Sequence, residues 1–306
     1  MLTRQKLTIS LAFLLINAFS CLGDSVYVLG ADLTTGGGLF GTVDLGTGGF
    51  HQIGPEIEGS TGLAPGPNGS LLTLTFSGNL NSINPANGVT TTVGPTGLGD
   101  CTTPASPCGP MSANTIGALG SMIYATDFAN NLYRVNALTG QATLVGPTGI
   151  LAIPFVPLTT NPDGTFNAYD EALFGANGKL YATFDAFTVD PATFTTSSLL
   201  IAPNLYQIVT ATGAATLIGP TDLNLGAVAN VNGTAYGFND GTTQVVTLDV
   251  ANGKTSLVTN FDPAAGIIVG AAPTPEPASI ALAGLGLLAA AICRRRAVAF
   301  LLKVRR

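Results

Sequence analysis

Apolar and polar residues alternate along most of this chain, in short runs that end at glycine, proline or asparagine. Five runs align with one another without gaps over about sixteen residues. They are Phe40–Pro55, Leu80–Pro95, Leu132–Pro147, Leu205–Pro220 and Val245–Asn260. One apolar column recurs in all five copies, at Val43, Ile83, Val135, Ile208 and Leu248. An alternation of period two indicates β-strands, so the chain is predicted to be a fivefold β repeat.

Each copy also contains the residues of a hairpin turn. Aspartate or asparagine follows the apolar column at Asp44, Asn84, Asn136 and Asp249, and Val209 is the exception. A glycine comes four residues later, at Gly48, Gly88, Gly140, Gly213 and Gly253. An Asx side chain can bond the turn backbone, and glycine supplies the positive φ that closes a hairpin. Each copy is therefore predicted to be two strands joined by a tight turn.

Two further strands are predicted before each hairpin. One is apolar with a central aromatic in most copies, and the other is rich in small residues. The first set is Val26-Tyr27-Val28, Leu71-Leu72-Thr73, Ile123-Tyr124-Ala125, Leu180-Tyr181-Ala182 and Ala235-Tyr236-Gly237. The second is Gly62-Leu63-Ala64, Ile116-Gly117-Ala118-Leu119, Ala172-Leu173-Phe174 and Gly226-Ala227-Val228. Small residues suit an inner strand near an axis, so the repeat reads as a four-stranded propeller blade.

The first copy lacks its small-residue strand, and a matching segment, Gly266–Gly270, occurs at the far end of the repeats. We therefore expect an all-β, five-bladed β-propeller over residues 24–270, whose first blade is closed by the N- and C-terminal strands. An open solenoid or a sandwich is the alternative. It explains the regular four-strand spacing and the matching ends less well.

Charge limits the classes of partner. Residues 24–274 hold sixteen acidic and three basic side chains, so this part carries a net charge of about −13. Nucleic-acid binding needs a basic surface and is excluded, whereas cations would be attracted. The chain has one histidine, His51, and no tryptophan. His51 aligns with Thr91, Thr143, Thr216 and Ser256 in an outer strand, so neither a multi-histidine metal site nor a Ser-His-Asp hydrolase is expected.

Residues 1–23 read as a secretory signal peptide. Arg4 and Lys6 precede the apolar run Leu7–Ile16, and small residues follow. Lipidation at Cys21 and an N-terminal membrane anchor are alternatives. Phe19 fits a lipoprotein site poorly, and the apolar run is short for a membrane span.

The C-terminal end has three parts. Residues 271–277 form a proline-rich linker, residues 278–293 a short apolar helix predicted to enter the membrane, and residues 294–306 a basic tail predicted to stay cytoplasmic. The linker contains Pro275, Glu276 and Pro277, and the tail begins with Arg294, Arg295 and Arg296.

This end resembles the PEP-CTERM sorting signal of Gram-negative bacteria. The resemblance implies recognition by an exosortase-type sorting enzyme, cleavage near Pro-Glu-Pro, and a destination at the cell surface or in a matrix of extracellular polysaccharide. The chain departs from the pattern because ten residues, 297–306, follow the arginine cluster. An ordinary single-span anchor is the alternative.

Three long insertions fall in connections that share one face of a propeller: residues 96–114, 148–169 and 185–203. Loops on a rigid scaffold commonly carry function, so this face is the predicted binding surface, with neutral drift of surface loops as the alternative. Cys101 and Cys108 lie in the first insertion, and a disulfide between them is expected in an oxidising compartment.

The same face is predicted to carry carboxylates and one tyrosine outside the repeat frame. The candidate ligand contacts are Asp127, Tyr169, Asp170, Glu171, Asp185 and Asp240. Oxygen-rich sites suit calcium, but no Asp-x-Asp-x-Asp loop is present. No cofactor is therefore assigned, and calcium binding at this face is the alternative.

Three functions remain open. The leading hypothesis is an exported, non-catalytic propeller that binds an extracellular polysaccharide or a surface protein. A carboxylate-based glycoside-active enzyme that uses Asp127, Asp170, Glu171 or Asp185 is the second. A structural matrix protein without a specific ligand is the third, because the fold alone does not decide.

Overall fold

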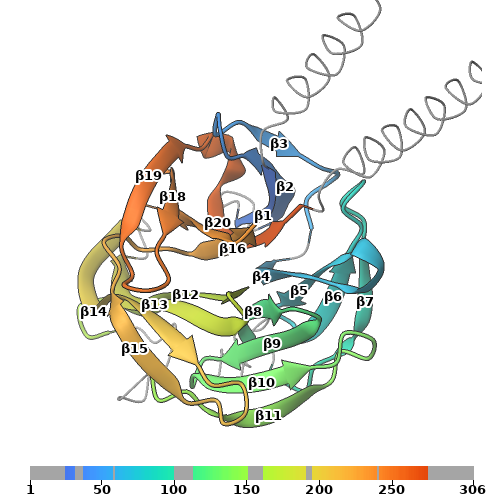
Figure 1. Cartoon of the computed structure of the whole chain (residues 1–306), viewed down its shortest axis with the longest axis horizontal. Helices are drawn as coiled ribbons and strands as arrows, with labels where there is room; N and C mark the ends of the chain where they lie inside the picture. Colours follow the sequence, from blue (N-terminus) through green and yellow to red (C-terminus); the bar gives the residue numbers. More distant parts are fainter. Residues whose placement is uncertain are drawn as a thin grey trace, which may run out of the picture. The chain divides into compact units, whose positions relative to one another are not determined.

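The computed structural model describes residues 25–31, 37–57, 59–99, 113–150, 161–190, 195–239 and 241–274. These residues form twenty strands in five four-stranded antiparallel sheets. Figure 1 shows the sheets arranged as blades around a common centre, with β4, β8, β12, β16 and β20 innermost. The predicted five-bladed propeller is confirmed.

Each blade runs from an inner strand to an outer strand. Blade 1 is β20 (Ile267–Pro273), β1 (Ser25–Ala31), β2 (Gly38–Asp44) and β3 (Phe50–Gln52); blade 2 is β4 (Ser60–Pro65), β5 (Leu71–Thr75), β6 (Asn79–Ile83) and β7 (Thr90–Pro95). Blade 3 is β8 (Ala113–Leu119), β9 (Met122–Asp127), β10 (Asn131–Val135) and β11 (Ala142–Pro147). Blade 4 is β12 (Phe166–Ala176), β13 (Lys179–Asp190), β14 (Thr195–Ile208) and β15 (Ala215–Pro220); blade 5 is β16 (Ala227–Val231), β17 (Thr234–Asn239), β18 (Gln244–Leu248) and β19 (Thr255–Asn260). Short 3₁₀ turns lie at Pro67–Gly69 and Pro263–Ala265.

Blade 1 is completed by both ends of the ring, as predicted. β20 pairs with β1 in an antiparallel register from Ala31↔Ile267 to Val26↔Pro273. The strand is longer than the predicted segment 266–270, and its last three residues come from the region predicted to be linker. Ala272 is fully buried, which explains why this segment belongs to the ring. Every sheet is complete within residues 25–273, so a protein of residues 24–274 contains the whole propeller.

The turns between the third and fourth strands form as their sequence indicates. The Asp44 carboxylate accepts hydrogen bonds from the backbone N–H groups of Gly46 and Thr47, and Asn84, Asn136 and Asp249 accept equivalent bonds. The glycines that follow have φ between 71° and 84°. Val209 lacks such a side chain, and its turn is held by backbone bonds from Thr212 and Gly213 to its carbonyl oxygen.

Small residues on the inner strands let neighbouring blades approach backbone to backbone. A Cβ atom on Gly117 of β8 would lie 2.0 Å from the carbonyl oxygen of Leu173 on β12. A Cβ atom on Gly175 of β12 would lie 2.4 Å from the carbonyl oxygen of Ala118. These distances are shorter than any van der Waals contact, so the ring in this form requires glycine at both positions.

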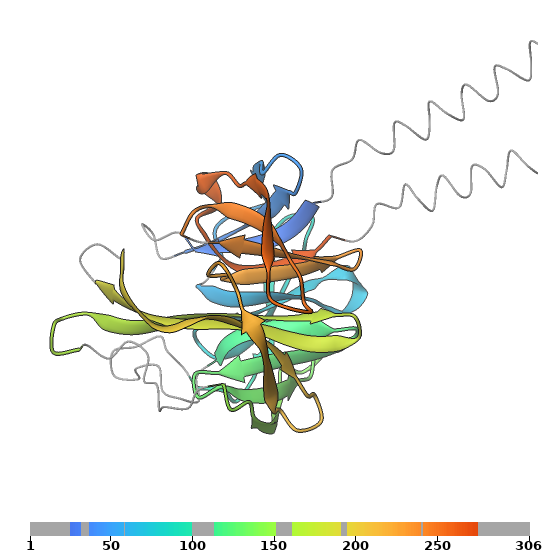
Figure 2. The same ribbon diagram turned by 60° about the vertical axis from the view of Figure 1, so that its left-hand side comes forward.

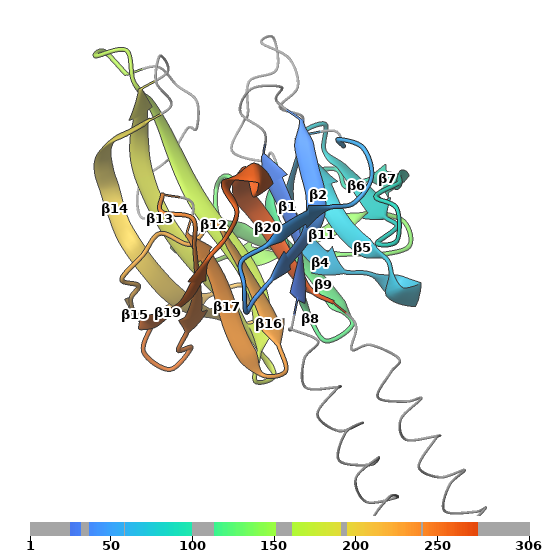
Figure 3. The same cartoon turned by 90° about the horizontal axis from the view of Figure 1, so that it is seen from above.

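Blade 4 differs from the other four blades in length. Its strands β12, β13 and β14 have 11, 12 and 14 residues, and they project beyond the ring in Figures 2 and 3. Residues 185–203 were predicted to be a loop. They are mostly strand, because β13 continues to Asp190 and β14 begins at Thr195 in a paired register. Asp185 therefore lies within a strand and not in a turn.

Among the residues that the structure describes, no helix is long and apolar enough to cross a membrane. The predicted signal peptide (1–23), the apolar helix (278–293) and the basic tail (294–306) lie outside the described residues.

The close approach of blades 3 and 4 gives a test of the packing. Gly117→Ala places a methyl group against the Leu173 backbone, and we expect the free energy of unfolding to fall by about 1–3 kcal/mol. Urea denaturation of residues 24–274 measures this change. Gly46→Ala is the control, because Gly46 lies at an exposed turn where three other repeats carry alanine, and it should leave stability within about 0.5 kcal/mol of wild type. Equal stability of the two variants would contradict the packing described here.

Candidate functional site

Four of the five predicted carboxylates lie among the described residues: Asp127 ends β9, Asp170 and Glu171 lie in β12, and Asp185 lies in β13. Consecutive residues of a strand point to opposite sides, so Asp170 and Glu171 face different neighbouring blades. Glu171 contacts blade 3, and Asp170 contacts Asn224, which lies just before blade 5. The structure therefore divides the predicted set into two groups.

Glu171 is buried against blade 3, with 6% of its surface exposed. Its Oε2 atom accepts hydrogen bonds from the amide of Asn114 and, at 2.8 Å, from the hydroxyl of Thr126. Its Oε1 atom has no hydrogen-bond partner among the described residues. Burial, together with the nearby Asp127 charge, outweighs these hydrogen bonds and raises the pKa of Glu171 to about 7.

Asp127 has a structural explanation. It ends β9, and its Oδ1 atom accepts hydrogen bonds from the backbone N–H groups of Ala129 and Asn131. Its Oδ2 atom accepts from the Asn131 amide and from the hydroxyl of Tyr133, both at 2.9 Å. Four donors saturate this carboxylate, which closes the turn between β9 and β10.

Asp170 and Asp185 face each other directly across β12 and β13. Asp170 accepts a 2.9 Å hydrogen bond from the Asn224 amide. Asp185 is only 3% exposed, and its Oδ2 atom has no hydrogen-bond partner among the described residues. Burial first, and the Asp170 charge second, raise the pKa of Asp185 to about 8; burial also raises the pKa of Asp170. Asp185 is therefore held in its neutral form at pH values where an exposed aspartate has ionised, because a second charge beside Asp170 in a buried site is unfavourable.

Tyr169 was the predicted ligand contact outside the repeat frame. Its ring is buried between Phe128, at a centroid distance of 5.3 Å, and Phe184, at 5.2 Å. The ring is thus part of the core between blades 3 and 4. Asp240, Cys101 and Cys108 lie outside the described residues, so the ligand role of Asp240 and the disulfide remain predictions.

The sequence did not identify Asn114, Thr126 and Asn224 as partners of the carboxylates. Asn114 is 57 residues from Glu171, and Asn224 is 54 residues from Asp170. Each pair is brought together only when neighbouring blades pack, and no local motif connects the two positions. No group of three or more His, Cys, Asp or Glu side chains among the described residues could hold a metal ion.

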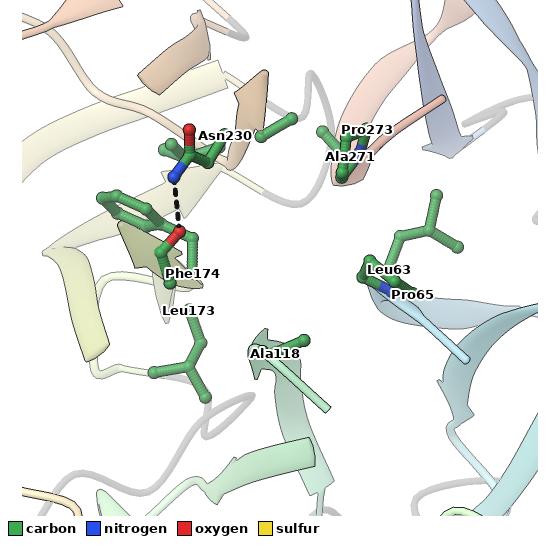
Figure 4. A pocket seen from close by; sticks show the side chains of 12 residues that line it. Leu63, Pro65, Ala118, Leu173, Phe174, Asn230, Ala271 and Pro273 are labelled. Atoms are coloured by element: carbon green, nitrogen blue, oxygen red, sulfur yellow. Dashed lines mark hydrogen bonds between the residues drawn. The ribbon is translucent and has the colours of Figure 1, made fainter. Parts of the chain in front are cut away.

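A second concave region lies on the axis, on the face of the hairpins between inner strands and their neighbours (Figure 4). It has a volume of about 170 Å³, with Leu63, Leu173, Phe174 and Ala271 among its lining residues. The amide of Asn230 donates to the Gly175 carbonyl oxygen at its rim. Deeper along the axis only about 10 Å³ of space remains, which is room for at most about one water molecule.

A family model described as the PEP-CTERM protein-sorting motif matches residues 273–296. The match includes Pro275, Glu276, Pro277 and the three arginines, and it confirms the resemblance seen in the sequence. The motif starts at Pro273, the last residue of β20. The chain is thus a β-propeller protein with a PEP-CTERM signal, which implies export and exosortase-mediated sorting at the cell surface.

No curated protein matches the sequence significantly. Among solved structures, a chain of a nidogen/laminin complex shares 12% identity and a TM-score of 0.46, covering 82% of this chain and 98% of that chain. The calcium-binding protein regucalcin from Agrobacterium tumefaciens shares 16% identity and a TM-score of 0.34, covering 64% and 56%. A PQQ-bound aldose sugar dehydrogenase from Streptomyces coelicolor shares 14% identity and a TM-score of 0.39, covering 69% and 63%. At these TM-scores, the ligands named for these three proteins give no information about the ligand of this chain.

The buried carboxylates give a pH test. Glu171 and Asp185 keep protons in the folded state at pH values where the unfolded chain has lost them. Stability is therefore expected to be highest near pH 4–5, to fall as the pH rises from there to about 7 for Glu171 and about 8 for Asp185, by up to about 1.4 kcal/mol per pH unit for each group, and to level off above pH 8. Thermal unfolding of residues 24–274 between pH 5 and pH 9 measures the slope.

Asp185→Asn removes the group with the higher pKa and should flatten this slope while raising the melting temperature at pH 9. Asp249→Asn is the matched control for the loss of one negative charge, because it changes an exposed turn to the residue that two other repeats carry. A wild-type melting temperature that does not change between pH 5 and pH 9 would contradict the assigned burial.

Proposed function

We propose that this protein is an exported, surface- or matrix-associated propeller without catalytic activity, and that it binds an extracellular polysaccharide or a surface protein. The observation that carries the proposal is the projecting part of blade 4. In a protein with a cell-surface sorting signal, three strands extend past the ring on the face that also carries the long connections. Paired strands of this kind present a preformed surface, so a partner can bind with little loss of conformational entropy in this protein.

The side chains of the extension support binding to a polymer. Leu199 and Leu200 on β14 are about half exposed, and Ser198 bonds Thr188 across the two strands at 2.7 Å. Exposed apolar side chains beside hydroxyl groups form a surface suited to sugars or to another protein. The net charge of about −13 on residues 24–274 disfavours strongly anionic partners.

The burial of the carboxylates supports a binding role over glycoside hydrolysis. A glycosidase needs two carboxyl groups that flank a bound sugar. Glu171 and Asp185 are 6% and 3% exposed, and Glu171 is held by Asn114 and Thr126. Glu171 packs blade 4 against blade 3, and Asp185 lies buried inside the sheet of blade 4, which makes both poor candidates for attack on a substrate.

Binding to the extracellular matrix of the producing cells tests the proposal. Purified residues 24–274 should co-sediment with the matrix. Replacing residues 187–200 by Asn-Gly joins Ala186 to Ile201, which already pair, through a two-residue hairpin. We expect this variant to lose at least tenfold in matrix affinity with a melting temperature within a few degrees of wild type.

Two further arms identify the partner. Retention after protease treatment of the matrix would assign a polysaccharide, and loss of retention would assign a surface protein. Release by a calcium chelator would show that calcium takes part. The proposal fails if wild type is not retained at all, or if the shortened variant binds as well as wild type.

A further inference from the structure

Asp170 and Asp185 lie at the base of the projecting part of blade 4 (Figures 2 and 3). They are direct partners across β12 and β13. The outer strand β15 pairs with β14 only as far as Asn204, which lies opposite Phe184 of β13. Asp185 is therefore the first residue of β13 beyond the four-stranded part of the sheet.

The two carboxylates face the connection that leads to blade 5. Thr183 lies two residues before Asp185, on the same side of β13, and its hydroxyl donates to the carbonyl oxygen of Leu225 at 3.1 Å. Leu225 is 2% exposed and belongs to the core between blades 4 and 5. These contacts fix the preceding residue, Asn224, beside the carboxylates, where its amide donates to Asp170 at 2.9 Å.

The site holds oxygen acceptors that no protein donor satisfies. Asp185 is 3% exposed, and neither its Oδ2 atom nor the Oδ1 atom of Asn224 has a hydrogen-bond partner among the residues described. In the same part of the chain, no basic side chain forms an ion pair with Asp170 or Asp185. Buried polar atoms without partners are rare, because each costs the free energy of its desolvation. Acceptors gathered without donors indicate that a cation is their partner.

We propose that Asp170, Asp185 and Asn224 bind a divalent cation of the calcium class. Carboxylate and amide oxygens are the hard ligands that calcium prefers, and water can complete its shell of about six to eight oxygens. A charge of +2 balances the two carboxylates, whereas a monovalent ion would leave one of them uncompensated in a buried site. Asp170 and Asn224 are partly exposed, so the ion can enter from solvent.

The cation would have a structural role. It would join β12 and β13 to the connection before β16, and so fix the base of the projecting strands against blade 5. The net charge of about −13 on residues 24–274 favours its capture. Two carboxylates and one amide form this site, which is distinct from a cluster of three acidic side chains, and the described residues hold no such cluster. The inference goes beyond the proposed function, because it concerns how blade 4 is held in the ring.

Calcium binding by purified residues 24–274 tests this inference. The protein is freed of cations with EDTA, dialysed, and titrated with CaCl₂ at pH 8 in excess NaCl by calorimetry. We expect one calcium ion per chain with a Kd of about 1 mM or tighter, and a melting temperature several degrees higher in about 10 mM CaCl₂ than in EDTA. Asp185→Asn should weaken calcium binding at least tenfold and remove most of this shift.

Glu171→Gln is the matched control. It neutralises a buried carboxylate next to Asp170 in the chain, but Glu171 faces blade 3, so its calcium response should equal that of wild type. The variant with residues 187–200 replaced by Asn-Gly keeps all three proposed ligands and should also bind calcium as wild type does. Its expected loss of matrix binding therefore separates the proposed function from this site.

Asn224→Asp decides the question if Asp185→Asn does not fold. It adds a third carboxylate, so it should bind calcium at least threefold more tightly than wild type and melt at a lower temperature in EDTA. The inference is overturned if wild type melts at the same temperature in CaCl₂ and in EDTA, which would show that the two carboxyl groups share a proton instead. It is also overturned if Asp185→Asn binds calcium as tightly as wild type, or if Asn224→Asp binds no more tightly. Matrix binding by wild type would in each case leave the proposed function standing.

Discussion

The structure depends on one strand pairing, between β20 and β1. It joins the last segment of the ring to the first and gives the first blade its fourth strand, so that all five sheets have four strands. The pairing is possible because β20 supplies the small-residue strand that the first repeat lacks. Glycines such as Gly117 and Gly175 then let the inner strands pack through their backbones. The closing strand ends at Pro273, where the sorting motif begins, so the ring must be complete immediately before the signal.

The repeat made most of the fold predictable from the sequence. Period-two alternation, the Asx residues and the positive-φ glycines are local features, and each formed the element it indicated. The length of blade 4 does not follow from the sequence, since residues 185–203 fall outside the repeat frame and their pattern indicates a loop. The candidate site was predicted only in part. Glu171 and Asp170 were identified, but Asn114 and Asn224 reach them from more than fifty residues away, by blade packing alone.

The burial of the carboxylates assigns them structural roles in place of the surface-binding or catalytic roles that the sequence suggests. In the sequence they resembled an acidic surface that could bind calcium or catalyse hydrolysis. In the structure Asp127 closes a turn, Glu171 joins blade 3 to blade 4, and Asp185 is paired with Asp170 inside a sheet. The departure from the repeat that is more informative about binding is the extension of blade 4.

Cooperative unfolding of two truncated proteins tests the central claim, that β20 closes the ring. The proteins are residues 24–274 and residues 24–266, compared by calorimetry. The account predicts a single sharp transition for the first and, for the second, a melting temperature lower by more than ten degrees or no transition, because β1 and the inner faces of its neighbours lose their partner. Equal melting temperatures for the two proteins would contradict closure by β20.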